Sequence, residues 1–210
     1  MENMKKIILL TTLVAFISVS AFAQKGSFKK NTFSENIGLL SPVGDWAEDF
    51  YESGVSLKLS YSRNCTKNFG FTTGFNFGHF NLNDDYLTFV GGSSNSSGPR
   101  FFNIGLGGLN DWEFGNSGFF LGINYQLLLG LFQDEEIDSP LSQYSTYGMF
   151  RNNYFQIGGC LGVQMYKTFG CFGLGIESSY NYTTPSAENF TGDSGLIDYV
   201  TLQLKLVQKF

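Results

Sequence analysis

The sequence is poor in the residues on which many catalytic and metal sites depend. It contains one histidine, His79, and three cysteines, Cys65, Cys160 and Cys171, whose spacing does not match a metal site. An odd number of cysteines leaves at least one thiol free, and we expect all three to serve as small packing residues. There is no nucleophile elbow and no second histidine to act as a general base, so we expect no enzyme with such a site.

Long apolar runs and excess positive charge are also missing. Residues 24–210 contain no stretch of the roughly 18 apolar residues that a membrane-spanning helix needs. The chain has 13 Lys and Arg against 18 Asp and Glu, a formal net charge of −5, which argues against a nucleic-acid partner. No pattern indicates a cofactor or a metal, and we expect neither.

The first 23 residues are predicted to be a cleaved signal peptide. Lys5 and Lys6 form a short basic region, and residues 7–19 are apolar with a few hydroxyl groups. Small residues then precede the expected cut between Ala23 and Gln24. The apolar stretch is short for a spanning helix, and an uncleaved amphipathic anchor is the alternative. The exported domain would be residues 24–210.

The chain is rich in phenylalanine, tyrosine and glycine, with 23, 11 and 26 residues respectively. Large apolar residues alternate with small or polar ones in eight segments, which is the two-residue period of a β-strand. In the second segment, for example, Leu57 and Leu59 alternate with Ser56, Lys58 and Ser60. The predicted strands span residues 33–43, 55–63, 69–80, 101–109, 119–132, 154–166, 170–182 and 199–210.

The composition of the two faces predicts a barrel with its apolar face outward. One face carries Phe, Leu, Ile and Val, whereas the other is rich in Gly, Ser, Asn and Gln, which suits the cramped interior of a small barrel. We therefore predict an all-β fold: an eight-stranded antiparallel up-and-down transmembrane β-barrel. A secreted soluble β-sandwich is the alternative.

Connection lengths support the same topology. Residues 64–68, 110–118 and 167–169 make short connections, and residues 44–54, 81–100, 133–153 and 183–197 make longer ones. This alternation is typical of an outer-membrane barrel with periplasmic turns and external loops. Aromatic residues gather near both ends, where membrane interfaces would lie. They are Trp112, Phe114, Phe119 and Phe169 near the short connections, and Phe80, Phe101, Phe132, Tyr154 and Tyr182 near the long ones.

The final segment resembles the assembly signal of bacterial outer-membrane barrel proteins. Leu202, Leu204 and Leu206 alternate before the terminal Phe210, although Gln208 stands where that signal usually has an apolar residue. In a closed barrel this strand must pair with the strand at residues 33–43, because closure removes both edges.

Taken together, the signal, strands, loops and terminal Phe210 resemble the small outer-membrane β-barrel family common in Bacteroidota, often called PorT-like. The resemblance implies a cleaved signal peptide, a location in the bacterial outer membrane, and contact with outer-membrane lipid, lipopolysaccharide and the barrel-assembly machinery. It implies no particular activity.

Three charged residues are predicted to point into the barrel: Lys58, Glu177 and Lys205. An unpaired charge in such an interior is costly, so we expect Glu177 to pair with a lysine. We interpret these charges as interior packing, because a conducting pore would need a wider barrel.

Most acidic residues fall in the four longer connections, which predicts a scaffold that displays acidic loops to an envelope component or partner protein. The acids could also hold Ca²⁺ or Mg²⁺ against lipopolysaccharide phosphates. Two alternatives are a lipid-modifying enzyme using His79 with Asp84 or Asp85, and a narrow channel for small solutes. The loop acids are Asp45, Glu48, Asp49, Glu52, Asp84, Asp85, Asp134, Glu135, Glu136, Asp138, Glu188 and Asp193.

Overall fold

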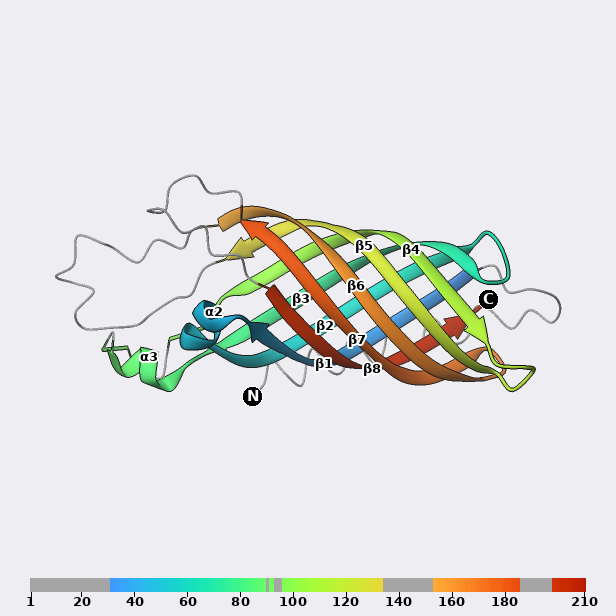
Figure 1. The fold of residues 1–210 in the computed structure, drawn as a ribbon, viewed down its shortest axis with the longest axis horizontal. Coiled ribbons are helices and arrows are strands. Elements are labelled where there is room, and N and C mark those ends of the chain that lie inside the picture. Colours follow the sequence, from blue (N-terminus) through green and yellow to red (C-terminus); the bar gives the residue numbers. More distant parts are fainter. Residues whose placement is uncertain (1–30, 90, 93–95, 134–152, 186–197) are drawn as a thin grey trace, which may run out of the picture.

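Eight antiparallel strands, each hydrogen-bonded to the next along the chain, close into a barrel in this computed structural model (Figure 1). The structure describes residues 31–89, 91–92, 96–133, 153–185 and 198–210, so the predicted signal peptide with Ala23 and Gln24 lies outside it. The strands are β1 Asn31–Val43, β2 Tyr51–Asn64, β3 Phe69–Leu82, β4 Arg100–Glu113, β5 Phe119–Gln133, β6 Asn153–Phe169, β7 Phe172–Pro185 and β8 Asp198–Lys209. Among the described residues, no helix has the length and apolar character needed to cross a membrane.

The last strand pairs with the first, as the sequence predicts. The β1–β8 register runs from Thr32 opposite Lys209 to Val43 opposite Asp198. Asn31 and Phe210 extend the seam, because each backbone N–H donates to the other's carbonyl oxygen at 2.9 Å. Closure leaves no unpaired edge, and this confirms the predicted eight-stranded barrel.

The two ends of the barrel differ in the length of their connections (Figure 1). Residues 65–68, 114–118 and 170–171 make tight turns beside the C-terminus, and we call this the turn end. At Gly170 the φ of 73° is one that glycine adopts without strain. The opposite loop end carries the longer connections, including the helices α2 (Asp45–Phe50) and α3 (Asp84–Phe89), which the sequence analysis did not predict.

Several strands extend further than predicted at the rims. β2 begins at Tyr51 rather than at residue 55, with an irregular register against β3 between Glu52 and Val55. β4 continues to Glu113 through a polar stretch predicted to be a turn. Hydrogen-bonded pairing with a neighbouring strand overrides weak local propensity at these positions.

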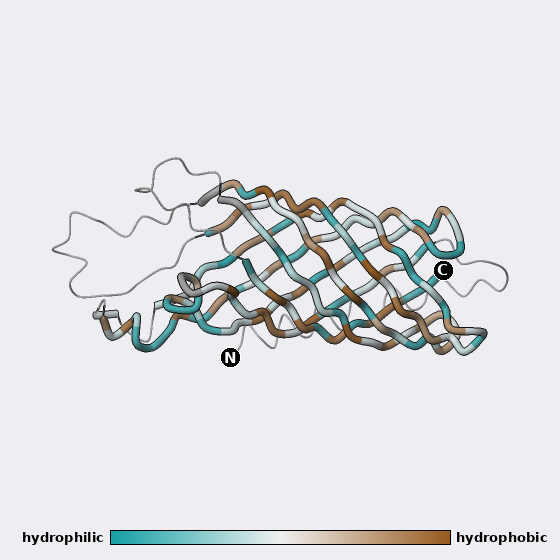
Figure 2. Tube along the Cα trace, in the orientation of Figure 1, coloured by the Kyte–Doolittle hydropathy of each residue, from teal (hydrophilic) through white to brown (hydrophobic). Residues whose placement is uncertain are grey.

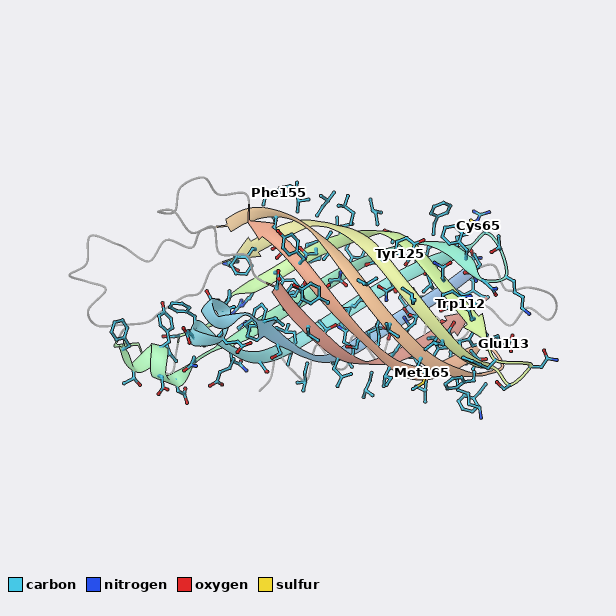
Figure 3. The ribbon with its side chains drawn as sticks, in the orientation of Figure 1. Cys65, Trp112, Glu113, Tyr125, Phe155 and Met165 are labelled. Atoms are coloured by element: carbon cyan, nitrogen blue, oxygen red, sulfur yellow. The ribbon has the colours of Figure 1, made fainter. Side chains whose placement is uncertain are left out.

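The outer wall is apolar and the interior is polar. Hydrophobic and hydrophilic residues alternate along the strands (Figure 2). Ile37, Phe71 and Leu204 are each more than 60% exposed, whereas Asn103 and Gln164 are almost completely buried inside. On the outer wall the ring of Tyr125 of β5, which is 41% exposed, lies over its cross-strand partner Gly108 (Figure 3). Such an apolar exterior suits hydrocarbon rather than water.

Candidate functional site

The centre of the barrel is built around the carboxylate of Glu177, which is completely buried. Lys58 Nζ donates to its Oε1 at 2.6 Å, and Lys205 Nζ donates to its Oε2 at 2.7 Å. The side-chain amides of Asn36 and Asn124 donate at 2.8 and 2.9 Å. The structure therefore places the three charges predicted to face inward in one ion-paired cluster, in which Glu177 binds both lysines.

The cluster continues toward the turn end through residues that the sequence analysis missed. Lys205 Nζ donates to Gln164 Oε1 at 2.5 Å, and Gln164 Nε2 donates to Asp111 Oδ1 at 2.6 Å. Tyr166 donates its hydroxyl hydrogen to Asp111 Oδ2. Asp111 therefore supplies a second negative charge that balances the two lysines, and the interior cluster is electrically neutral.

The side chains of this network pack across the centre of the barrel. Two cavities of about 10 Å³ each adjoin the cluster, which is roughly the space for one water molecule. A buried carboxylate with four donors needs no water to satisfy it, and well-ordered hydrogen bonds make such a network rigid.

At the loop end, an apolar cluster closes the interior and corrects one prediction. Phe80, Phe101 and Phe132 point inward and are at most 6% exposed, so they do not belong to an outer aromatic belt. Phe80 and Phe101 each lie two residues along the strand from an inward-facing residue, Gly78 and Asn103 respectively, and therefore share the inward face. They pack with Leu40, Ala47, Tyr51, Leu82 and Tyr199.

Aromatic contacts and helix α2 tighten this closure. The ring centroids of Phe101 and Tyr199 are 4.7 Å apart, and those of Phe80 and Tyr199 are 5.9 Å apart. Ala47 of α2 is 2% exposed in the same cluster, so the first long connection folds over the mouth of the barrel.

The turn end is closed by a stacked aromatic pair and a lysine. The rings of Phe120 and Tyr166 stack at 5.0 Å with an interplanar angle of 6°. Lys209 Nζ lies 3.3 Å from the centroid of the Phe120 ring, a cation–π contact. Among the described residues, the interior therefore has apolar or aromatic packing at both ends and ion pairs between them.

Aromatic residues predicted for the turn-end interface do face outward. Trp112, Phe114 and Phe169 are 41%, 55% and 63% exposed, and Figure 3 shows Trp112 near the end of β4. Tyr182 is 41% exposed near the loop end. The side chain of Tyr154 lies outside the described residues. This placement at the two ends is the one expected for the aromatic belts of a transmembrane barrel.

His79 lies on the outer wall of β3, on the same face as Phe77, which is two residues earlier in the strand. Within the described parts of the chain, no hydrogen bond or ion pair joins it to Asp84 or Asp85, and its Nδ1 is buried without a partner. Within the described residues, Asp84 and Asp85 therefore do not orient this imidazole as a catalytic carboxylate would.

The three cysteines form no disulfide: Cys65 is exposed, Cys160 is buried and Cys171 is intermediate. Cys160 Sγ lies 3.8 Å from Asn124 Oδ1, beside the interior cluster. Among the described residues, no group of three or more His, Cys, Asp or Glu side chains is arranged to hold a metal ion.

Acidic side chains are exposed at the loop end. Glu48 and Asp49 on α2 and Asp84 and Asp85 on α3 all face solvent. Glu52, near the start of β2, is exposed as well. The remaining loop acids at positions 134–138, 188 and 193 lie outside the described residues, as does the side chain of Asp45.

Comparison with known proteins defines the class of fold. No protein-family model and no curated protein matches the sequence. Several solved structures do match. Neisserial surface protein A matches with a TM-score of 0.53 and 13% sequence identity, and the match covers 89% of this chain and all of that one. Ail of Yersinia pestis matches with a TM-score of 0.51 and 13% sequence identity, over 87% of this chain and all of that one. The outer membrane protein OprG from Pseudomonas aeruginosa matches with a TM-score of 0.51 and 13% sequence identity, over 88% of this chain and 98% of that one.

The fold is therefore that of small outer-membrane β-barrel proteins. At this level of identity the likeness concerns architecture alone. The PorT-like assignment stays a prediction from the sequence.

Proposed function

We propose that this chain is an integral outer-membrane protein, a non-catalytic scaffold that presents acidic loops to an envelope component or a partner protein. The observation that carries the proposal is the combination of an apolar outer wall with an interior closed at both ends. The wall is suited to lipid and the interior to packing, which leaves the loop end as the main surface for a partner.

Several features support the outer-membrane location. The exposed apolar side chains continue around the barrel on all eight strands. The predicted signal peptide and the terminal assembly signal point to export and barrel insertion. The architectural likeness to outer-membrane proteins agrees with both.

The two alternative functions have less support. A channel would need an open interior, and the Glu177 cluster and the apolar cluster at the loop end argue against one. A lipid-modifying enzyme based on His79 would need an orienting carboxylate, and neither Asp84 nor Asp85 contacts it.

Photo-crosslinking from single positions tests the display of loops. Phe89, at the end of α3, is 87% exposed, and Phe114 at the turn end is a matched exposed aromatic residue, at 55%. A photoreactive phenylalanine at position 89 should give discrete adducts in intact cells, and one at position 114 should not give the same adducts. Neutralising Glu48, Asp49, Asp84 and Asp85 together should weaken the adducts from position 89. Identical adducts from both positions, or adducts that persist after neutralisation, would contradict the proposal.

A further inference from the structure

Two adjacent rows of side chains cross the outer wall near the loop end. In the upper row His79 of β3 is in register with Arg100 of β4, and Arg100 with Gln133 of β5. In the lower row, two residues further from the loop end, Phe77 is in register with Phe102, and Phe102 with Leu131. Polar groups therefore sit directly above apolar ones on the same three strands.

These rows line an open hollow of about 500 Å³ on the outside of the barrel. Arg100 is exposed there, and Phe77, Phe102 and Leu131 are 43%, 44% and 54% exposed. Unlike the lysines of the interior, Arg100 has no ion pair or hydrogen bond within the described residues.

The chemistry of the upper row favours an anion with oxygen acceptors. A guanidinium presents a planar fork of donors that matches phosphate oxygens, and the bond is charge-assisted. His79 and Gln133 line the same hollow and add an imidazole and an amide. The lower row offers only hydrocarbon and aromatic surface. A ligand that matches both rows has a phosphate head and an apolar tail.

We propose that this hollow binds a phosphorylated lipid of the outer leaflet, with the phosphate on Arg100 and His79 and an acyl chain over Phe77, Phe102 and Leu131. The inference rests on the proposed membrane location, because the loop end must then lie at the level of the outer headgroups. The site lies on the outer wall, and Arg100 gives it a positive charge, opposite in sign to the exposed acids of α2 and α3.

Lipid binding by the whole purified barrel in detergent micelles tests the site. Native mass spectrometry would compare lipid A carrying its phosphates with the same lipid A after dephosphorylation. Arg100→Gln removes the proposed phosphate ligand. Arg63→Gln is the matched control, because Arg63 is an exposed arginine on β2 at the turn end, the opposite end of the barrel from the hollow. Heat-modifiable gel migration would show that each variant is folded.

Wild-type protein should bind phosphorylated lipid A at least about tenfold more tightly than Arg100→Gln, as expected for one charge-assisted hydrogen-bonded contact. His79→Leu should weaken binding by roughly two- to tenfold, and Arg63→Gln should bind like wild type. Removing the lipid phosphates should lower wild-type binding to the level of Arg100→Gln.

Three outcomes would overturn the proposal: equal loss in Arg63→Gln, equal affinity for both forms of lipid A, or complete displacement of the lipid by excess inorganic phosphate. The last result would assign the site to a free anion. Each of these would leave the crosslinks from position 89 unchanged, so failure of the lipid site is distinguishable from failure of the scaffold function.

Discussion

Among single residues, Glu177 has the largest role in the interior. Its carboxylate is removed from water, which is costly unless charge and hydrogen bonds compensate. Two lysines and two asparagine amides provide that compensation in one place. The same carboxylate joins β2, β7 and β8 across the barrel, so a single residue ties strands that are not all neighbours.

Replacing Glu177 with Gln should destabilise the barrel by about 3–5 kcal/mol, because Lys58 and Lys205 would be left buried without their shared partner. Lys58→Met should cost less, since Glu177 keeps its bond to Lys205 at 2.7 Å. Denaturant unfolding in lipid vesicles, followed by tryptophan fluorescence, would measure both. Equal costs, or a larger cost for Lys58→Met, would contradict the assigned role.

At this scale the alternation of strand residues predicts which charges face inward but not every partner. Lys58, Glu177 and Lys205 fall on the polar face, so their burial follows from the two-residue period. Asp111 was missed because the polar stretch around it resembles a turn. Pairing with β5 and a hydrogen bond from the Asp111 N–H to the Asn68 carbonyl oxygen keep it extended. Phe80 and Phe101 were wrongly assigned to an outer aromatic belt, because their aromatic character favours a membrane interface although their strand positions lie on the inward face.

Among elements, the seam between β1 and β8 depends on a close approach of the two backbones. Gly38 lies opposite Gln203, and an added Cβ would overlap the Leu202 carbonyl oxygen and the Cα of Gln203. Both are backbone atoms, which cannot move without disturbing the register. The close approach therefore requires glycine at the position where the barrel closes.

Gly38→Ala should cost about 1–3 kcal/mol, the usual range for forcing an extra methyl group into a packed site. Gly159→Ala is the matched control on β6, where an added Cβ would meet only the Gln126 carbonyl oxygen, at 3.9 Å. That substitution should change stability by less than about 0.5 kcal/mol. Refolding yield into vesicles and the temperature of the gel-mobility shift would rank the two variants. Comparable losses would show that the close backbone approach at Gly38 does not set the cost of its substitution.

The helices α2 and α3 could not be predicted from local sequence. Each has six residues, too few to show a 3.6-residue period. Short helices owe their stability to packing, and here Ala47, Phe50, Tyr86 and Leu87 contact the apolar cluster at the loop end. Asn83 also accepts a hydrogen bond from the Asp85 N–H at 2.8 Å, capping α3.

For the whole molecule, architecture follows from the sequence far more directly than function does. Eight two-faced segments with alternating connection lengths leave few arrangements that bury one face, expose the other to lipid and leave no edge. The outer hollow beside Arg100 was not predicted, because it depends on the register of β3, β4 and β5. Register aligns residues that are far apart in the chain, and no local pattern specifies it completely.

Thiol labelling of intact cells tests the central claim, a barrel that spans the outer membrane with its loop end outside. Cys65 is exposed at the turn end (Figure 3), whereas Phe89 is exposed at the loop end. One variant keeps Cys65 and carries Cys171→Ser; the other carries Phe89→Cys with Cys65→Ser and Cys171→Ser. A large membrane-impermeant maleimide should label the Phe89→Cys variant on intact cells, and should label Cys65 only after the outer membrane is permeabilised. Labelling of Cys65 on intact cells, or of neither position before permeabilisation, would contradict the account.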